Sequence, residues 1–449
     1  MRDWSPEQVA QAAGARLLAP ARPAAGPRRA VIDSRAAGEG DLFVGLPGER
    51  ADGGAFAAQA LAGGAWGVLV SPQHAEAARC AVSGVLLAAQ DPLAALGALA
   101  GAWRRELGCA VVGITGSTGK TSTKDILAAM LSQTLRTVAS TANHNTEIGL
   151  PLAILGAPAG TQALVLEMAM RGAEQIAALT TIAAPDVGVI VNVGPVHLER
   201  LGGVEQVAAA KAELIRGMPA GATVVIPADE PLLKPHLRDD VETVTFGEGG
   251  DVRLVRADGE LVEIALAGER LTLELPFTQA HNRLNALAAL AAARALGAPV
   301  SGRVEVDFSA LRGERIDLPN DVAVINDCYN ANPMSMRAAL DDLALSAPGR
   351  RVAVLGDMLE LGDDERAFHE ALGAQASERG VDLLVTVGPL AAAAAGAFDG
   401  EAHSVADAGE AAALLGELLA AGDTVLVKGS RGVGLEVVAE ALAATAGDG

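Results

Sequence analysis

The sequence lacks the marks of a membrane protein or a secreted protein. No uninterrupted apolar run approaches the roughly 20 residues that a helix needs to cross a bilayer, because alanine stretches such as residues 391–395 end quickly. The first residues, MRDWSPEQ, contain no apolar segment that could serve as a signal peptide. The three cysteines, Cys80, Cys109 and Cys328, share no metal-binding or redox spacing. We therefore expect a soluble protein of the reducing cytoplasm.

A concentrated positive charge is also missing. The chain has 34 lysines and arginines against 55 acidic residues, which gives a net charge of −21 at pH 7, and no basic block interrupts it. A surface for nucleic acid or for anionic lipid needs such a block, so we expect neither as a partner. Any phosphate in the chemistry must be held locally.

Lysine is scarce. Only five of the basic residues are lysines, at positions 120, 124, 211, 234 and 428. Arginine can carry surface charge equally well, but it cannot replace a compact ammonium that reaches a phosphate or an amine that must lose its proton. The bias raises the expectation that several of these lysines take part in chemistry.

The length and the hydrophobic patterning predict three α/β domains. The 449 residues, half of them hydrophobic, suffice for about three cores. Short apolar runs within residues 1–90 (AVID, DLFVGL, WGVLV, GVLLA) predict a small α/β domain. A helix over 92–107 then opens a central domain, 91–306, in which strands and helices alternate as in a parallel sheet with crossover helices.

Two changes of pattern complete the predicted organisation. The apolar period becomes two between residues 241 and 275 (VRLVRA, ELVEIALA, ERLTLEL), which predicts antiparallel strands added to the central domain before a helix over 283–296. Alternation restarts over 307–449 with VAVIND, RVAVLGD, DLLVTVG and TVLVKG, which predicts another open parallel α/β domain. No internal repeat is visible in the sequence.

The strongest local signal is CAVVGITGSTGKTSTKD, where a strand-like run ends in a glycine-rich loop and a helix begins at Lys120. Backbone N–H groups of residues 116–120 can surround phosphate oxygens, Lys120 can offset the charge of a transferring group, and the Thr121 hydroxyl can bind Mg²⁺. The first glycine of the common G-x-x-x-x-G-K-[ST] spacing is replaced by Ile114, which points away from motor and signalling ATPases.

Two further candidates follow strand-like runs, where ligands bind in open parallel sheets. Glu167 ends ALVLE, and its carboxylate can complete the coordination of a phosphate-bound Mg²⁺. His197 follows DVGVIVNVG and could bind a second cation. Taken singly, each is more often a structural residue, a helix-start acid or a packed histidine, and only their shared context favours the metal-binding interpretation.

Lys211, in VEQVAAAKAELI, allows two interpretations. The ordinary one is a solvated helix face paired with Glu205 or Glu213. The other is a lysine near two cations that CO₂ converts to a carbamate, which turns a repelling ammonium into an oxygen ligand. The sequence alone does not decide between them.

Motifs along almost the whole chain resemble the Mur ligases, and most closely the branch that adds D-alanyl-D-alanine to UDP-N-acetylmuramoyl-tripeptide. YNANP together with GDM-x-ELG separates this branch from its sister ligases. The motifs that carry the resemblance are DSRAAGEGDLFVGLPG, TGSTGKTST, ANHNTEIGLPLAIL, NVGPVHLERLGG, HNRLNALAAL, NDCYNANPMSM, LGDMLELG and VKGSRGVGLE.

The resemblance implies a three-domain α/β architecture: a small N-terminal domain for the UDP precursor, a central P-loop ATP-binding domain with added antiparallel strands, and a C-terminal Rossmann-like domain for the amino substrate. It implies an ATP-dependent amide ligase of peptidoglycan precursor synthesis that works through an acyl phosphate, with two Mg²⁺ and a carbamylated Lys211. We expect a monomer. The third residue of the peptide and the contacts to UDP and dipeptide stay open.

The resemblance also implies roles for individual residues. Lys120, His197 and Lys211 would be catalytic. The cation ligands would be Thr121, Glu167, His197 and Lys211. The ATP-binding residues would be Gly116, Ser117, Thr118, Gly119, Lys120, Thr121, Ser122, Asn282, Arg315 and Asp327, with Arg312 as an alternative to Arg315. The substrate-binding residues would be Ser34, Arg35, Asn143, Asn145, Thr146, Asn330, Asn332, Lys428, Ser430 and Arg431.

Other functions remain as alternatives at this stage. A regulatory P-loop ATPase would need TGSTGKT and Glu167 but not two additional α/β domains. A dinucleotide-dependent oxidoreductase would need a G-x-G-x-x-G after a C-terminal strand, which the sequence does not contain. A sister Mur ligase or an enzyme similar to folylpolyglutamate synthase shares the ATP core and differs in the amino substrate.

Overall fold

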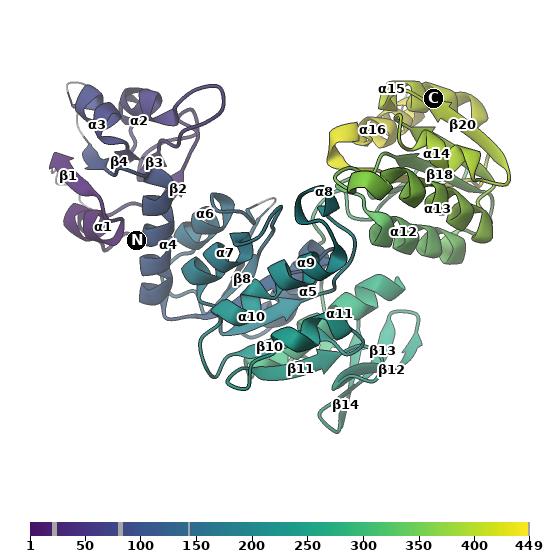
Figure 1. Ribbon diagram of the computed structural model, residues 1–449, viewed down its shortest axis with the longest axis horizontal. Helices are drawn as coiled ribbons and strands as arrows, with labels where there is room; N and C mark the ends of the chain where they lie inside the picture. Colours follow the sequence, from purple (N-terminus) through teal and green to yellow (C-terminus); the bar gives the residue numbers. More distant parts are fainter. Residues whose placement is uncertain (20–24, 80–83, 142–143, 448–449) are drawn as a thin grey trace.

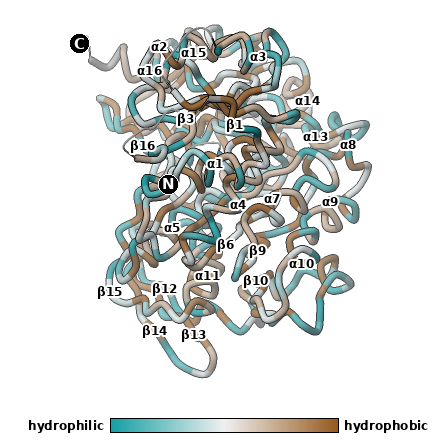
Figure 2. The backbone as a smooth tube through the Cα atoms, turned by 90° about the vertical axis from the view of Figure 1, so that its left-hand side faces the viewer, coloured by the Kyte–Doolittle hydropathy of each residue, from teal (hydrophilic) through white to brown (hydrophobic). Residues whose placement is uncertain are grey.

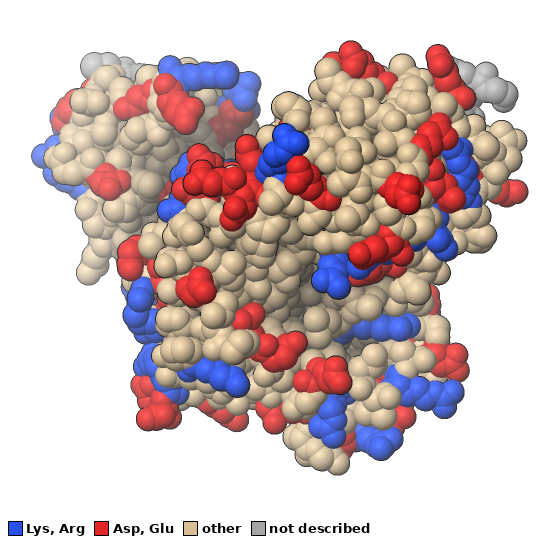
Figure 3. Space-filling view, turned by 45° about the vertical axis from the view of Figure 1, so that its right-hand side comes forward, with Lys and Arg blue, Asp and Glu red and all other residues tan. Residues whose placement is uncertain are grey.

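The computed structural model describes residues 1–19, 25–79, 84–141 and 144–447. Its strands form three separate sheets. Figure 1 shows the first and the last sheet, with their helices, at opposite sides above the central one. No helix in these ranges is long and apolar enough to span a membrane. Hydrophobic and hydrophilic residues alternate along the tube in Figure 2, and acidic and basic side chains are interspersed on the face in Figure 3.

The first sheet has the order β1-β5-β4-β3-β2 and is parallel except for the pair β1 and β5. Four of its strands match the predicted apolar runs, and β1 is additional. Its strands are β1 Arg16–Ala19, β2 Arg29–Val31, β3 Asp41–Val44, β4 Gly67–Val70 and β5 Val85–Ala88, and its helices are α1 Pro6–Ala12, α2 Ala57–Ala62 and α3 Pro72–Ala78.

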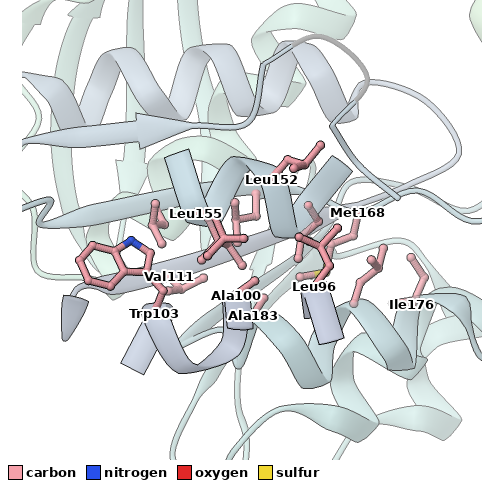
Figure 4. Packing of buried hydrophobic residues seen from close by; sticks show 14 of the residues in the cluster. Leu96, Ala100, Trp103, Val111, Leu152, Leu155, Met168, Ile176 and Ala183 are labelled. Carbon is pink, nitrogen blue, oxygen red and sulfur yellow. The ribbon is translucent and has the colours of Figure 1, made fainter. Parts of the chain in front are cut away.

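Helix α4 (Pro92–Leu107) joins the first sheet to the second, with the bounds that the sequence predicts. The Asp91 carboxylate caps it by accepting hydrogen bonds from the backbone N–H groups of Leu93 and Ala94, and Gly108, in the left-handed conformation (φ 58°), ends it. Its buried face packs against α6 (Gly149–Gly156) and α7 (Gln175–Ala183) (Figure 4). One apolar cluster therefore runs from the N-terminus into the central domain.

The central sheet has ten strands in the order β15-β14-β13-β12-β11-β10-β9-β6-β8-β7. The half from β7 to β11 is parallel, whereas β12, β13 and β14 pair antiparallel, so the predicted change of pattern is confirmed. The strands are β6 Ala110–Thr115, β7 Thr137–Ala139, β8 Ala163–Glu167, β9 Val187–Ile190, β10 Thr223–Pro227, β11 Glu242–Phe246, β12 Val252–Asp258, β13 Leu261–Leu266, β14 Glu269–Glu274 and β15 Gly302–Arg303.

Helices cover both faces of the parallel half. Helices α5 and α11 pack on each other and on one face, while α4, α6 and α7 lie on the other. Helix α11 begins three residues before the predicted start at 283. The helices that follow α4, apart from α6 and α7, are α5 Lys120–Ser132, α8 Leu198–Leu201, α9 Val204–Lys211, α10 Glu213–Gly217 and α11 Ala280–Ala295.

The third sheet has the order β16-β17-β21-β18-β19-β20 and is parallel except for the edge strand β16. Separate apolar clusters lie on its two faces, as in a doubly wound domain. Its elements are β16 Glu314–Asp317, β17 Ala323–Asn326, α12 Pro333–Ser346, β18 Arg351–Gly356, α13 Glu365–Glu378, β19 Leu383–Val387, α14 Ala392–Gly396, β20 Glu401–Val405, α15 Ala408–Leu418, β21 Thr424–Lys428 and α16 Glu436–Gly447.

Candidate active site

The glycine-rich loop connects β6 to α5, which begins at Lys120 as predicted. Gly119 has a φ of 74°, the left-handed conformation, and a Cβ at this position would lie 2.6 Å from Asn285 Oδ1 of α11. Only glycine satisfies both conditions. The neighbour of Asn285 on the same helix face is Asn282, whose Oδ1 lies 3.4 Å from Asn285 Nδ2. The predicted nucleotide residue Asn282 is therefore close to the loop.

Asn192, which sequence analysis did not single out, shapes this loop. Its Oδ1 accepts hydrogen bonds from the backbone N–H groups of Ser117 (3.0 Å) and Thr118 (2.9 Å), and its Nδ2 donates to Thr118 Oγ1 (2.8 Å). The Ser117 hydroxyl in turn bonds to the backbone of Gly194. The N–H groups of Ser117 and Thr118, which are predicted to face phosphate, therefore donate to a side chain in this structure. Backbone N–H groups in a tight loop need a hydrogen-bond acceptor, and Asn192 supplies it. The signal for Asn192 was its place just after β9, at the edge where Thr115 ends β6.

Lys120 lies inside the curve of the loop. Its ammonium donates a hydrogen bond to the carbonyl oxygen of Gly116 at 2.8 Å. Burial lowers the pKa of Lys120, the nearby Glu167 carboxylate opposes that shift, and Arg312 adds to it. This hydrogen bond holds the Lys120 amine inside the loop that is predicted to bind phosphate.

Thr121 and Glu167 form a pair of oxygen donors beside Lys120. The Thr121 hydroxyl donates to Glu167 Oε2 at 2.8 Å, and both residues are buried. Asn145 Nδ2 donates to the other carboxylate oxygen at 2.8 Å, so Asn145, which is predicted to face the sugar-peptide substrate, contacts Glu167 in this structure. A hydroxyl and a carboxylate are the hard oxygen donors that suit Mg²⁺. In the described part of the chain no cluster of three or more His, Cys, Asp or Glu side chains could hold a metal, so a cation here needs the threonine hydroxyl and the nucleotide's oxygens.

Lys211, at the end of α9, is only 2% exposed, so its interpretation as a solvated helix residue is wrong. Across the described ranges its amine has no hydrogen bond or ion pair, and Glu213 instead accepts from the N–H groups of Glu174 and Ala177. Burial, with Lys120 nearby, lowers the pKa of Lys211 well below its usual value. A lowered pKa raises the fraction of neutral amine, which is the form that reacts with CO₂.

His197 precedes α8 in a left-handed conformation (φ 54°), which is uncommon for a residue with a side chain. Its Nδ1 is hydrogen-bonded to the carboxylate of Glu360, which belongs to the C-terminal domain. Burial lowers the pKa of His197, the Glu360 carboxylate raises it, and Lys120 and Lys211 lower it further. The structure therefore brings His197 and the two lysines into one electrostatic neighbourhood.

Arg312, and not Arg315, reaches the phosphate loop. Arg312 Nη2 lies 3.2 Å from Thr121 Oγ1, and its guanidinium stacks over the ring of Tyr329 at 4.1 Å. Arg315 lies in the edge strand β16 and pairs with Asp317 at 2.8 Å, away from the loop. Of the two arginines, Arg312 is therefore the one that contacts the start of α5 in this structure.

Asn332 joins the C-terminal domain to the same loop. It caps α12, and its Nδ2 lies 3.4 Å from the carbonyl oxygen of Ser117. Asn332 was predicted to face the dipeptide substrate. In this structure it contacts the loop that is predicted to bind the phosphates of ATP.

The remaining C-terminal candidates form hydrogen bonds and ion pairs within their own domain. Lys428, 2% exposed, donates to Asp327 Oδ2 at 2.6 Å and to the carbonyl of Asn330 at 3.0 Å. The Ser430 hydroxyl accepts from the backbone of residue 359, and Arg431 pairs with a glutamate of α16. None of these side chains has a bond to the phosphate loop among the contacts of the described residues.

The N-terminal candidates lie apart from the loop. Ser34 Oγ bonds to Gln59 at 3.4 Å, and Arg35 pairs with Asp33 and lowers the pKa of that carboxyl to about 2. Thr146 is exposed before α6, whereas Asn143 lies outside the described residues. Within the described residues, no hydrogen bond or ion pair joins the side chains of Ser34, Arg35 or Thr146 to the phosphate loop.

Comparison with known proteins agrees with this geometry. Residues 114–293 match the Mur ligase middle domain, and residues 311–431 match the family described as Mur ligase, glutamate ligase domain. The UDP-N-acetylmuramoyl-tripeptide--D-alanyl-D-alanine ligase of Synechocystis sp. is 38% identical over 421 residues, 92% of this chain and 91% of the relative. That of Bacillus subtilis is 37% identical over 425 residues, 91% and 92% of the two chains.

The chain belongs to the Mur ligase family. A crystal structure of MurF from Acinetobacter baumannii superposes with a TM-score of 0.88 at 31% identity and covers 98% of both chains. The MurF ligase of Thermotoga maritima in complex with ADP gives 0.82 at 32% identity and covers 94% of this chain and 98% of the other. The expected three-domain Mur ligase fold and the assignment to the ATP-dependent amide ligases are confirmed.

Proposed function

We propose that this Mur ligase joins D-alanyl-D-alanine to UDP-N-acetylmuramoyl-tripeptide with ATP, in the cytoplasm, where ATP is available. The observation that carries the proposal is the meeting of the phosphate loop with the C-terminal domain. Arg312 and Asn332 touch Thr121 and Ser117, so the nucleotide site and the domain expected to bring the amine share one junction. The curated relatives that act on these substrates match across all three sheets.

The chemistry requires such a junction. A carboxylate and an amine do not condense at neutral pH, because the carboxylate is a poor electrophile with a poor leaving group. If the tripeptide carboxylate attacks the γ-phosphate of ATP, an acyl phosphate and ADP form; attack by the dipeptide amine then releases phosphate. Lys120 is placed to stabilise charge on the transferring phosphoryl group. Acyl phosphates hydrolyse, so docking of the C-terminal domain serves to exclude water.

Two Mg²⁺ would complete the site by neutralising the phosphate oxygens of ATP. Thr121 and Glu167 offer two adjacent oxygens for the first, and His197 with a carbamate on Lys211 would hold the second. The support for the carbamate is the buried, unpartnered amine of Lys211 and its lowered pKa. As an ammonium, Lys211 would instead repel both cations.

We propose three further assignments. The domains span residues 1–90, 91–306 and 307–449, and the protein is a monomer. We also propose that Ser34 and Arg35 contact the UDP moiety; their domain lies at the opposite side of the molecule from the C-terminal domain (Figure 1).

The test is a phosphate-release assay with ATP and Mg²⁺, in which UDP-muramoyl peptides are crossed with D-alanyl-D-alanine and with single amino acids. We expect release only when a UDP-muramoyl-tripeptide and the dipeptide are both present. Release with a single amino acid would assign the chain to a sister ligase. Release that ignores the dipeptide would favour a P-loop ATPase and contradict the proposal.

A further inference from the structure

Glu360 is a residue of the GDMLELG motif that the proposed chemistry does not use. It lies in the loop between β18 and α13, and its carboxylate crosses the domain junction to His197 Nδ1. Both residues have left-handed backbones, with φ of 64° and 54°. A left-handed backbone persists only where surrounding contacts hold it. The contacts on either side of Glu360 therefore show whether the fold fixes the position of its carboxylate at His197.

The loop that carries Glu360 is anchored at each preceding peptide. The N–H of Met358 donates to the buried His369 Nε2 at 2.9 Å, and the N–H of Leu359 donates to Ser430 Oγ at 3.0 Å. The carboxylate of Asp357 accepts from the backbone N–H groups of residues 390 and 391. The loop therefore presents Glu360 from a fixed frame inside the C-terminal domain.

The loop also seats against the segment that carries His197. A Cβ at Gly362 would lie 3.3 Å from the backbone nitrogen of Glu199, and the carbonyl of Glu360 lies 3.5 Å from that same nitrogen. The largely exposed guanidinium of Arg171 also lies near this carboxylate, with its Nε 3.8 Å from Glu360 Oε1. The two backbones thus approach closely, with the carboxylate of Glu360 aimed at the imidazole.

The hydrogen bond decides which ring nitrogen of His197 is free. A carboxylate can only accept, so in the neutral ring the proton resides on Nδ1 and Nε2 keeps its lone pair. No residue within the described ranges bonds to Nε2. Histidines that bind metals commonly donate their other N–H to a carboxylate, which orients the ring and fixes its tautomer.

We propose that Glu360 is a positioning residue for the second cation: it holds His197 with Nε2 free to bind the metal, so that this cation site is complete only when the C-terminal domain is docked. The proposal rests on the proposed function, since it takes His197 as a ligand of the second cation. An interdomain ion pair without this role is the competing explanation. It predicts weaker docking when Glu360 is removed but no change in the affinity for the second cation.

The test uses the full chain with ADP in bicarbonate buffer and Mn²⁺ as the probe, followed by electron paramagnetic resonance. We expect two bound Mn²⁺, and in E360A a second-site affinity about 10- to 100-fold lower with the first site unchanged. E360Q, whose amide oxygen can still accept from Nδ1, should lose less than E360A. E199Q, which removes an exposed carboxylate from the same segment, is the matched control and should bind as the wild type does.

Nitrogen NMR of ¹⁵N-histidine-labelled protein, with His197 assigned by its absence in H197Q, reads the tautomer directly. We expect a proton on Nδ1 in the wild type and a mixture of tautomers in E360A. Equal second-site affinity in E360A and wild type, or a proton on Nε2 in the wild type, overturns the proposal. The wild-type spectrum still decides if E360A does not fold. Neither measurement needs peptide or dipeptide, so failure of the proposed function would show only in the turnover assay.

Discussion

Two regions differ in how their polar groups are held. One is the phosphate pocket, formed by the glycine-rich loop with Lys120, Thr121 and Glu167; the other is the junction at which the C-terminal domain contacts the central domain. In the pocket, the Glu167 carboxylate accepts hydrogen bonds from Thr121 and Asn145, and the backbone N–H of Glu167 donates to Ser140 Oγ. All of these residues belong to the central domain. At the junction, single side chains such as Arg312 and Glu360 reach across from loops of another domain.

The difference separates two demands. Charges that meet the transferring phosphoryl group need fixed positions, which a buried network within one core supplies. A closure that must open again needs few contacts, each with a small net free energy. We therefore expect substitutions in the pocket to affect the chemical step, and substitutions at the junction to affect nucleotide binding and docking.

The largest effect should come from Lys120→Ala in the pocket. Loss of a charge directed at the transferring phosphoryl group should lower kcat by about 100- to 1,000-fold. Among the described residues the side chain bonds only to the carbonyl of Gly116, so the melting temperature should stay close to that of the wild type. Phosphate release and thermal melts measure both quantities. Near-normal turnover in a folded variant would contradict the assignment of the loop.

Substitution of Lys211 should be almost as severe. If its carbamate binds a cation, Lys211→Ala should lose activity by about 100-fold, and a short carboxylic acid in the buffer should restore part of it. Lys211→Arg keeps a positive charge but supplies no oxygen, so it should be equally inactive and should not respond to the acid. A fully active Lys211→Arg enzyme would refute the carbamate.

Arg312 tests the junction. Arg312→Ala removes a charged hydrogen-bond donor and the stacking on Tyr329, and should lower kcat/KM for ATP by about 10- to 100-fold. Arg315→Ala loses only an exposed pair with Asp317 and should change kcat/KM by less than about twofold. Steady-state kinetics with varied ATP compares the two. The reverse ranking would show that the domain docks differently during turnover.

The smallest effect concerns stability at the same junction. Burial raises the pKa of Asp342 in α12 to about 6, opposed by a hydrogen bond from Gln279 of the central domain. Between about pH 4 and 6 the unfolded chain loses this proton before the folded one does, so the group's contribution to stability falls as pH rises. Asp342→Asn should therefore melt at the wild-type temperature near pH 4 and above it at pH 7.

Asp341→Asn is the matched control for that experiment. Asp341 pairs with Arg379 on the neighbouring helix, so its loss should give no gain in melting temperature at pH 7. A gain in Asp341→Asn equal to that in Asp342→Asn would trace the effect to net charge instead of burial.

The central fold and the phosphate loop could be predicted because their signals are local. The cap at Asp91 and the stop at Gly108 define α4, and a strand followed by a glycine-rich loop and Lys120 defines the pocket. The missed strands β1, β16 and β20 are short and lie at sheet edges, and β16 (ERID) is mostly exposed. Edge strands carry little apolar patterning, because only part of their surface is buried.

The roles at the junction depended on tertiary structure. Arg312 and Arg315 lie three residues apart, Arg312 just before β16 and Arg315 within it, and only the position of β16 decides which one reaches Thr121. Glu360 is 163 residues from its partner His197. No periodicity connects such positions, since the contact exists only after two separate cores have formed.

The apolar cluster that crosses α4 bears on how this chain divides into modules. It contains Met1 and Leu96 as well as Val241, and Trp4 meets Trp103 edge to face at 5.5 Å. A cut at residue 90 would therefore split one interior, whereas a cut after Phe308, whose ring still packs on Phe277 of the central domain, passes between apolar clusters. Of the two outer domains, only the C-terminal one is attached in a way that permits exchange, in a chimera or during evolution, without rebuilding the interior of its neighbour.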